Sequence, residues 1–366
     1  ESHIQKINFK MKLSIIIVSY NAPKHLELCL DSCQEALKNV DGEIIVIDND
    51  SSEIDFIFLK KTFPTVNFLL QNENLGFAKA NNIGVENALG EYILILNPDT
   101  IIPENLFESL IEFHQSKEKI GFVGVRMIDT NGNFHPESKR NIPTAKNSFS
   151  KLYSRFNHSK KNNYYKLEVD EFEIAPCEIL VGAFMFTTKK IYQEIGGFDP
   201  RYFMYGEDID LSFSAELAGY KNYYKGDITV LHYKGESTKK DKKYYKHFFE
   251  AMMIFLAKYY QKNWLHYQLL RSGILIKYLI QLFKFSLHSP NNTSKIEVKA
   301  ENLFWIDKKS DFKSLSNNEI AIDASFFTYQ EILSIISENN SSSRSFYIRP
   351  KNKNYLIGDD KLIINL

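Results

Sequence analysis

The sequence lacks the features that mark secreted, membrane-spanning and nucleic-acid-binding proteins. Its three cysteines, Cys29, Cys33 and Cys177, are too few for a disulfide framework, which favours a reducing compartment. No run reaches the roughly 18 uninterrupted apolar residues of a membrane span, and residues 1–10 contain no apolar signal-peptide core before Met11. The 45 basic and 45 acidic residues cancel, so no overall field attracts nucleic acid. We therefore expect a cytoplasmic protein, soluble or peripheral at the inner face of the cell membrane, with no nucleic-acid partner.

Hydrophobic residues make up 44% of the 366 residues, which is enough to bury a sizeable core. In the first third of the chain, short apolar, β-branched runs alternate with helical patterns. Such alternation predicts an α/β fold with a mainly parallel central sheet covered on both faces. The expected strands are 13–19, 43–48, 66–70, 92–97 and 120–125, and the expected helices are 23–38, 77–89 and 103–115, the last with a proline at its start.

The remaining chain continues the pattern less regularly. Residues 126–175 are polar and basic and too long for a plain connection, which predicts a loop on the acceptor side of the site. Further expected elements are a strand over 178–187, helices over 188–195 and 207–218, strands over 221–224 and 228–232, two helices within 241–288, a linker at 291–294, and a strand–helix–strand unit over 319–325, 329–338 and 346–350. These divide the chain into an N-terminal extension (1–10), a catalytic domain (11–238), a helical extension (239–289) and a small α/β unit (290–366).

Polar side chains follow three of the expected parallel strands. They are Ser19-Tyr20-Asn21, Asp48 and Asn97-Pro98-Asp99. Because ligands bind beyond the carboxyl ends of such strands, Asp48 is placed to accept a hydrogen bond from a uracil or thymine imide, with Tyr20 near the base. The alternative is helix capping, by Asn21 for the helix at Pro23 and by Asp48 or Ser51 for the next.

Asp99 ends the strongest strand of the pattern. A carboxylate there can hold Mg²⁺ or Mn²⁺ against diphosphate oxygens, because hard cations prefer oxygen ligands. The alternative is a turn, since Asn-Pro-Asp is common turn chemistry. Upstream, Asn74 and Gly76 open an expected helix, and helix N-termini favour anions such as diphosphate. A loop with a capped helix would look the same.

Glu207 and Asp208 open another expected helix after an aromatic stretch, Tyr202-Phe203-Met204-Tyr205. Adjacent acids suit a base that deprotonates an acceptor beside a structural partner. They could equally complement the helix dipole. His232 ends a strand, where a lone histidine is either a ligand or a structural residue.

Taken together, these segments resemble the family-2 glycosyltransferases of the GT-A fold, especially their rhamnosyltransferase-like branch. The resemblance covers about Leu13 to Ser237. It rests on seven segments in a shared order: IIIVSYN (15–21), IVIDNDS (45–51), NENLGFAKANNIG (72–84), ILNPD (95–99), VGAFM (181–185), GGFDPRYFMYGEDIDLSFSAELAGY (196–220) and LHYKGES (231–237).

The resemblance implies an inverting transferase that moves a sugar from a nucleotide diphosphate to an acceptor hydroxyl. Asp208 would be the catalytic base with Glu207 beside it, and Asp99 and His232 would hold Mn²⁺ or Mg²⁺. The expected nucleotide-sugar contacts are Ser19, Tyr20, Asn21, Asp48, Asn74, Gly76, Asn81 and Asn97. Many relatives carry an acid where this chain has Asn97, which predicts modest, nucleotide-dependent metal affinity. The acceptor would be a saccharide or a lipid-linked saccharide of a bacterial surface polysaccharide, and the donor a UDP- or dTDP-sugar such as dTDP-rhamnose.

Two other functions fit parts of the pattern. A nucleotidyltransferase would usually show a Gly- and Lys/Arg-rich phosphate loop after the first strand, where this chain has SYNAPKHLEL. A non-catalytic carbohydrate- or nucleotide-binding module would have no need to keep Asp99, Asp208 and His232 together.

The helix expected over 274–287 has a polar stripe of Lys277, Gln281 and Lys284. The remaining surface is broad and apolar, and comprises Ile274, Leu275, Tyr278, Leu279, Leu282 and Phe283. Such a helix either packs on this domain or a partner subunit, or lies in a lipid interface with its lysines facing anionic head groups.

Overall fold

The protein is described here by a computed structural model. It describes residues 11–51, 56–143, 164–233, 242–262, 264–287, 303–306, 317–341, 343–358 and 363–366. The N-terminal extension over 1–10, the linker expected at 291–294 and much of the loop expected over 126–175 lie outside these ranges.

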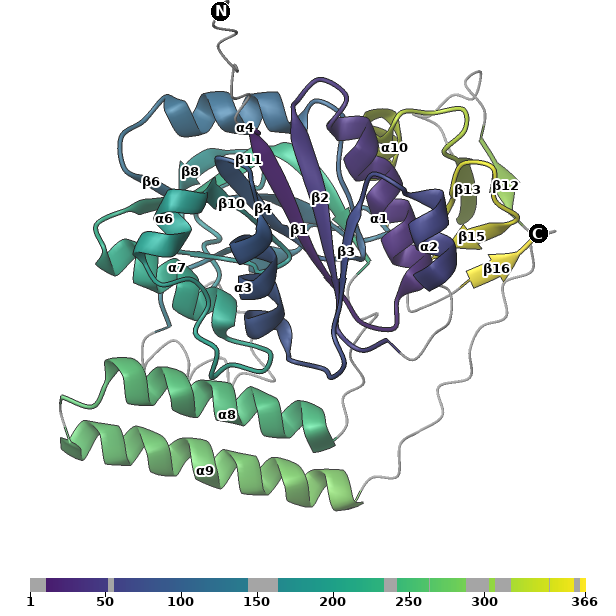
Figure 1. The fold of residues 1–366 in the computed structure, drawn as a ribbon. Coiled ribbons are helices and arrows are strands. Elements are labelled where there is room, and N and C mark those ends of the chain that lie inside the picture. The colour runs from purple at the N-terminus through teal and green to yellow at the C-terminus, as the bar shows by residue number, and fades with distance from the viewer. Residues whose placement is uncertain are drawn as a thin grey trace, which may run out of the picture.

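The first half of the sheet is parallel and follows the predicted alternation (Figure 1). Its strands lie in the spatial order β3-β2-β1-β4. Every residue of β1 and β4 is buried, as the apolar runs IIIV and YILIL within them predict. The elements are β1 (Leu13–Ser19), α1 (Pro23–Ala36), β2 (Gly42–Asp48), α2 (Phe56–Thr62), β3 (Asn67–Leu70), α3 (Phe77–Asn87) and β4 (Tyr92–Leu96).

The second half of the sheet is mixed. Strand β10 runs antiparallel between β4 and β6, and β11 pairs parallel with β6 and antiparallel with β5 and β8. The elements are β5 (Thr100–Ile101), α4 (Leu106–Gln115), β6 (Ile120–Ile128), η1 (Pro136–Ser138), β7 (Lys139–Arg140), β8 (Ile174–Pro176), β9 (Ile179–Leu180), β10 (Phe184–Thr188), α6 (Lys189–Glu194), α7 (Glu207–Leu217) and β11 (Lys221–His232).

Three expected boundaries in this half are wrong. The strand expected over 178–187 is split, because β9 pairs with β7 whereas β10 joins the central sheet. The two strands expected over 221–232 are one strand, β11, whose register with β6 shifts between Lys225 and Thr229. Helix α4 begins three residues after Pro103, since β5 first pairs with β11 and a turn follows.

Two apolar layers cover the sheet. One contains buried residues of α1, α2 and α4, such as Leu26, Leu59 and Leu106. The other contains residues of α3, α6 and α7, such as Ala78, Tyr192 and Leu211. With both faces covered, ligands reach the sheet only at its strand ends.

The carboxyl ends of β1 and β2 point toward a helical hairpin, α8 (Lys242–Tyr259) and α9 (Trp264–Leu287), that lies beneath the sheet (Figure 1). The sequence predicted both helices. Among the described residues, no helix combines the length and apolar character needed to cross a membrane.

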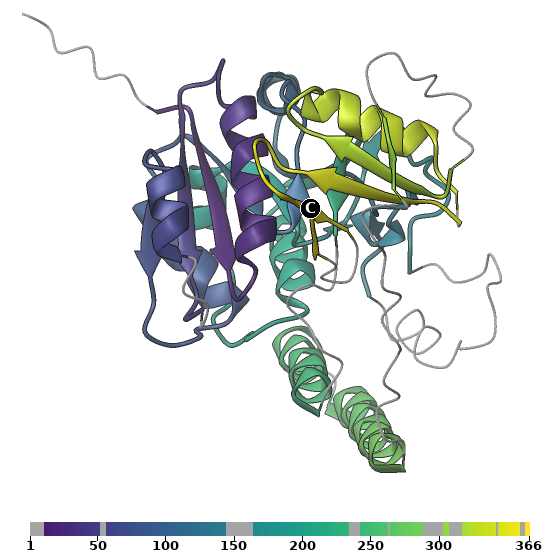
Figure 2. The same cartoon turned by 90° about the vertical axis from the view of Figure 1, so that its right-hand side faces the viewer.

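The C-terminal residues form a second, smaller sheet beside the N-terminal half of the chain (Figure 2). This unit shares an apolar core with the large sheet, where Leu28, Ile101 and Leu231 pack with residues such as Ile322 and Ile332. It is therefore fixed to the body of the protein. Its elements are β12 (Phe304–Trp305), β13 (Glu319–Asp323), α10 (Tyr329–Glu338), β14 (Ser345–Arg349), β15 (Tyr355–Ile357) and β16 (Ile363–Asn365).

Candidate active site

The ends of β1 and β2 lie side by side, because Ser19 pairs with Asp48 in the parallel register. The hydroxyl of Ser51 donates to Asp48 Oδ1 at 2.5 Å and accepts from the backbone N–H of Asn21 at 3.0 Å. This network fixes the Asp48 carboxylate at the strand end, while the half-exposed Tyr20 remains accessible. Helix α1 begins after Ala22 without a side-chain cap, so the capping role considered for Asn21 is not observed.

An amide cluster that the sequence did not reveal orders the loop before α3. The Asn49 side chain donates to Asn74 Oδ1 at 2.9 Å, and Asn74 Oδ1 also accepts from the Gly76 amide at 3.0 Å. Asn49 Oδ1 accepts from the Leu75 amide at 2.9 Å. Asn49 is buried. Its position among polar residues after β2 did not predict that its side chain would bind the loop before α3.

Gly76 brings this loop against the aromatic segment before α7. Its φ is +79°, and a Cβ atom there would lie 2.4 Å from the Phe203 carbonyl oxygen. That same oxygen accepts a hydrogen bond of 2.7 Å from the Phe77 amide. Only glycine fits this contact, which joins the expected donor side of the site to its expected acceptor side.

Asn81 has a structural role. Its side chain is fully buried and donates to the Phe77 carbonyl within α3 at 3.0 Å. Its Oδ1 is buried without a hydrogen-bond partner among the described residues, and the ligand contact expected at Asn81 stays a prediction.

Asn97, Asp99 and His232 meet where β4 and β11 end. Asp99 Oδ1 lies 3.3 Å from His232 Nε2, and the side-chain nitrogen of Asn97, Nδ2, lies 3.4 Å from the same ring atom. The pairing of Thr100 with His232 in the β5–β11 ladder creates this meeting. Burial raises the pKa of Asp99, but the nearby His232 and His25 outweigh burial and hold that pKa below its ordinary value.

This cluster fits a divalent cation bound together with a diphosphate. Asp99 Oδ1 is buried and, within the part of the chain that the structure describes, makes no hydrogen bond apart from its 3.3 Å contact with His232 Nε2, which leaves a lone pair for a cation. Within the described ranges, no group of three or more His, Cys, Asp or Glu side chains is placed to hold a metal ion. Mg²⁺ and its analogues commonly take one or two protein ligands and complete their shell with substrate phosphates and water.

Asp208 opens α7 and is surrounded by hydrogen-bond donors. Its Oδ2 accepts from Arg140 Nη2 at 2.6 Å and from the Gly182 amide at 3.0 Å, and its Oδ1 accepts from the Ile209 amide at 2.8 Å. A carboxylate has about four lone-pair sites, so one site on Oδ1 remains for an acceptor hydroxyl. Arg140 comes from the segment that the sequence predicted only as a loop, and its 68-residue separation from Asp208 concealed the pair.

Glu207 is buried beside Asp208 and lies in a different environment. Burial and the neighbouring Asp208 carboxylate raise the pKa of Glu207 to about 8. Tyr205, two residues before Glu207, has a φ of +71°, an uncommon conformation for a residue other than glycine. Such backbone strain occurs where the surroundings over-determine a functional turn.

A short stretch between β9 and β10 connects the Asp99 cluster to Asp208. The Ala183 carbonyl accepts a hydrogen bond of 3.0 Å from the backbone N–H of Asn97, and the backbone N–H of the adjacent Gly182 donates to Asp208. A Cβ atom on Gly182 would lie 3.1 Å from the Asp208 Cβ. The candidate metal ligands and the candidate base therefore share one side of the sheet.

Comparisons with known proteins agree on one family. The family model described as Glycosyl transferase family 2 matches residues 14–195. An N-acetylglucosaminyl-diphospho-decaprenol L-rhamnosyltransferase of Mycobacterium tuberculosis (strain CDC 1551 / Oshkosh) is 25% identical over 241 residues, which cover 63% of this chain and 78% of that protein. Rhamnosyltransferase WbbL of Escherichia coli (strain K12) is 29% identical over 233 residues, covering 60% and 82%. Among solved structures, the mannosyltransferase PcManGT from Pyrobaculum calidifontis in complex with GDP-Man and Mn²⁺ is similar, with a TM-score of 0.48 and 16% identity over 77% of each chain.

The family match begins in β1 and ends at the close of α6, so it includes the strand ends and the 181–185 stretch described above. The mixed sheet, whose first half is parallel, is the GT-A arrangement that the sequence predicted. The nucleotidyltransferase and the non-catalytic module are not favoured by this match. The match identifies the chain as a member of family 2 of the glycosyltransferases, enzymes that transfer glycosyl groups from nucleotide-sugars, and two of its relatives are named rhamnosyltransferases.

Proposed function

We propose that the enzyme transfers a sugar from a dTDP- or UDP-sugar, with dTDP-rhamnose the first candidate, to a hydroxyl of a lipid-linked saccharide, and that it inverts the anomeric carbon. The names of the two rhamnosyltransferases support the choice of sugar, and the decaprenol-linked acceptor in one of those names supports the acceptor class. The product would serve polysaccharide synthesis at the cell envelope, on its cytoplasmic side.

The observation that carries the proposal is that Asn97, which lies beside the Asp99–His232 pair, and Asp208 are hydrogen-bonded to neighbouring residues, Ala183 and Gly182. One cluster suits a leaving diphosphate, and the other suits an attacking hydroxyl. Two polar clusters at one sheet edge allow the bond to the diphosphate to break while the bond to the acceptor forms on the opposite face.

In the proposed reaction, Asp208 Oδ1 accepts the proton of the acceptor hydroxyl. The hydroxyl oxygen forms a bond to the anomeric carbon, and the diphosphate leaves with the electron pair of the broken carbon–oxygen bond. Arg140 and the Gly182 amide hold Oδ2, so the carboxylate keeps its orientation. Asp48 and Tyr20 would contact the base, and Asn74, Gly76 and the α3 N-terminus would border the diphosphate.

Asp99 and His232 would hold Mn²⁺ or Mg²⁺, with Asn97 beside them. When bound, the cation would neutralise the negative charge that builds on the departing diphosphate. Because the protein supplies only one carboxylate to this cluster, we propose that the cation binds tightly only together with the nucleotide.

The test combines donor binding with transfer. Thermal unfolding would be measured with dTDP-rhamnose, UDP-glucose and UDP-N-acetylglucosamine, each with Mn²⁺ and with excess chelator. The stabilising donor would then be supplied with a prenyl-diphosphate-linked N-acetylglucosamine. We expect metal-dependent stabilisation by one donor and a product of inverted anomeric configuration. Retained configuration, or full transfer in excess chelator, would refute the proposed mechanism.

A further inference from the structure

Helices α8 and α9 form a hairpin held together by aromatic and aliphatic side chains (Figures 1 and 2). Phe249 of α8 packs against Tyr278 of α9, with their ring centroids 5.2 Å apart. Leu256 lies in the same cluster as Leu270 and Ile274. One side of α9 is therefore used for contact with α8.

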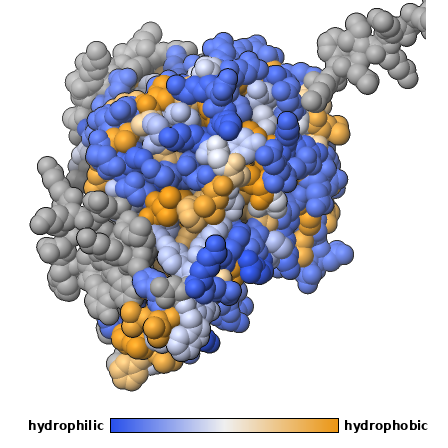
Figure 3. Space-filling view, turned by 90° about the vertical axis from the view of Figure 1, so that its left-hand side faces the viewer, coloured by the Kyte–Doolittle hydropathy of each residue, from blue (hydrophilic) through white to orange (hydrophobic). Residues whose placement is uncertain are grey.

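The opposite side of α9 is apolar and exposed. We call it the outer face. Its side chains expose between 49% and 73% of their surface, and they recur at spacings of three, four and seven residues, as a single helix face requires. The outer face consists of Leu265, Leu269, Ile276, Leu279, Ile280 and Phe283. Figure 3 shows an apolar area at the lower end of the molecule, where the hairpin lies.

This arrangement differs from the sequence-based expectation for this helix. Lys277 and Gln281 are half-buried, Ile274 is buried, and the remaining apolar residues are divided between the α8 contact and the outer face. Burial and the charge of Lys284 lower the pKa of Lys277. Part of the polar stripe, Lys277 and Gln281, is therefore half-buried near α8, and the apolar side chains of the outer face are exposed.

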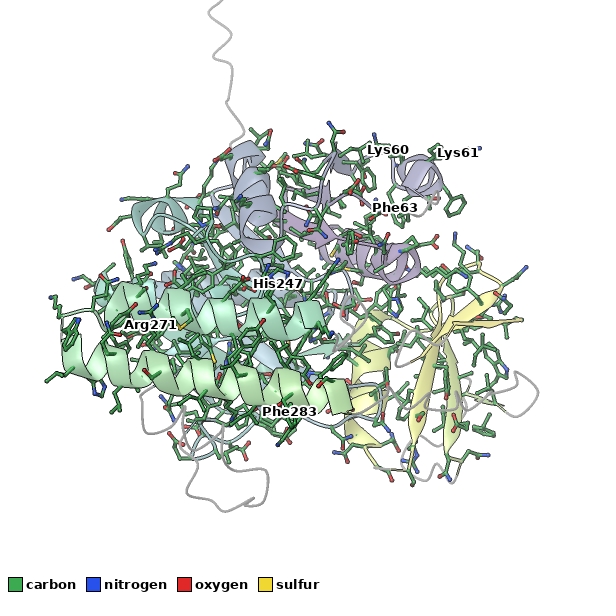
Figure 4. The ribbon with its side chains drawn as sticks, turned by 90° about the horizontal axis from the view of Figure 1, so that it is seen from below. Lys60, Lys61, Phe63, His247, Arg271 and Phe283 are labelled. Atoms are coloured by element: carbon green, nitrogen blue, oxygen red, sulfur yellow. The ribbon has the colours of Figure 1, made fainter. Side chains whose placement is uncertain are left out.

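The charged side chains of α9 itself are all cationic. Helix α9 contains no Asp or Glu. Arg271 and Lys284 are exposed, and at about 100° per residue they lie on opposite flanks of α9, with Lys284 next to the outer face and Arg271 farther round toward α8. Figure 4 shows Arg271 and Phe283 on the hairpin as seen from below. An apolar face with cations on both flanks of the same helix is suited to the boundary between acyl chains and anionic head groups.

We propose that the outer face of α9 docks on an anionic lipid bilayer. The apolar side chains would enter the boundary of the acyl chains, and Arg271 and Lys284 would contact lipid phosphates. Charge favours this occupant over a second copy of the chain. Two outer faces packed together would bring their cations close, and α9 offers no carboxylate to pair with them.

Docking in this way would place the proposed base, Asp208, near the bilayer, a consequence that rests on the proposed function. His247 of α8 stacks on Phe203 with ring centroids 4.5 Å apart, and Lys258 pairs with Asp210 of α7 at 2.7 Å. Packed helices lie about 8–10 Å apart. The N-terminus of α7, which carries Asp208, would therefore be separated from the lipid by roughly the thickness of the hairpin, a suitable position for an acceptor anchored by a prenyl chain.

The test is flotation of the full chain with vesicles of equal parts phosphatidylglycerol and phosphatidylcholine, compared with phosphatidylcholine alone. We expect flotation with the anionic vesicles that weakens as salt increases, because salt screens the attraction between lysine or arginine and phosphate. Replacing two outer-face residues, as Leu279→Gln with Phe283→Gln, should lower partitioning by about tenfold or more. The matched control is Leu89→Gln with Leu217→Gln, two exposed leucines elsewhere on the surface, which should float like the wild type.

A second pair of variants isolates charge. Arg271→Glu with Lys284→Glu should reduce flotation several-fold and remove most of its salt dependence. Lys60→Glu with Lys61→Glu makes the same change in net charge on α2, away from the hairpin (Figure 4), and should have little effect.

Two results would overturn the proposal. One is wild-type protein that stays at the bottom of the gradient at low salt. The other is unchanged flotation of the Leu279 and Phe283 variant. Concentration-dependent dimers that this variant abolishes, without flotation of the wild type, would assign the outer face to a second copy. Hydrolysis of the nucleotide-sugar, measured on the same proteins without lipid, reports on the catalytic function separately, so either idea can fail alone.

Discussion

Replacing Asp208 by Asn removes the proposed base and also disturbs the group of donors around it. All three of its partners, Arg140 Nη2, the Gly182 amide and the Ile209 amide, donate hydrogen bonds. An asparagine NH₂ group accepts none, so in either orientation it must face at least one of these donors. Asp208→Asn is therefore not a silent replacement.

The magnitudes follow from burial. The Arg140 and Asp208 side chains are 8% and 13% exposed, and removal of one partner of a buried ion pair costs about 3–5 kcal/mol. We expect Asp208→Asn to lower the free energy of unfolding by an amount near the lower end of that range, because the amide oxygen can still accept one bond. Turnover should fall by about 10²–10⁴-fold, as expected for loss of a positioned base.

The double variant Asp208→Asn with Arg140→Met separates the two effects. Without the guanidinium, no buried charge is left unpaired, so about half or more of the lost stability should return. Turnover should stay low, because methionine restores no base. Urea unfolding and initial rates of glycosyl transfer would be measured on the wild type, both single variants and the double variant.

Turnover of Asp208→Asn within a few-fold of the wild type would refute the assignment of the base. A double variant no more stable than Asp208→Asn would show that the unpaired Arg140 charge is not the source of the instability.

Three further predictions concern neighbouring groups. Asp99→Asn should weaken Mn²⁺-dependent nucleotide binding by about tenfold or more and leave metal-free binding nearly unchanged, as measured by calorimetry. Because the pKa of Glu207 is raised to about 8, the folded protein keeps a proton there that the unfolded chain loses above about pH 4.5. The free energy of unfolding should therefore fall as pH rises from about 5 to 8. Glu207→Gln should remove roughly 2–4 kcal/mol of that fall, as measured by urea titrations at several pH values. Gly76→Ala should destabilise the fold by about 2–4 kcal/mol, and clearly more than Gly196→Ala, since both glycines have positive φ but only a Cβ at Gly76 would meet the Phe203 carbonyl; equal losses would contradict the contact argument.

Local sequence patterns were sufficient to predict the elements that surround the site. Strands β1, β2 and β4 contain the apolar runs IIIV, IIVI and YILIL, and such runs between helices are typical of strands buried in a parallel sheet. The positions of Asp48 and Asp99 follow from those strands, because a residue at the end of a buried strand, or shortly after it, lies at the sheet edge. Helix α10 shows its start in sequence through the Thr328–Glu331 capping box.

Tertiary structure decided which polar residues meet. Arg140 pairs with Asp208 across 68 positions, Asn49 holds Asn74 across 25, and Asn97 approaches His232 across 135. Neither hydrophobic period nor turn chemistry encodes such pairs, because they depend on the order of strands in the sheet. The same holds for α9. Its sequence makes it amphipathic, but its packing against α8 determines which side chains remain exposed. In the folded protein, that packing leaves the apolar residues of the outer face exposed.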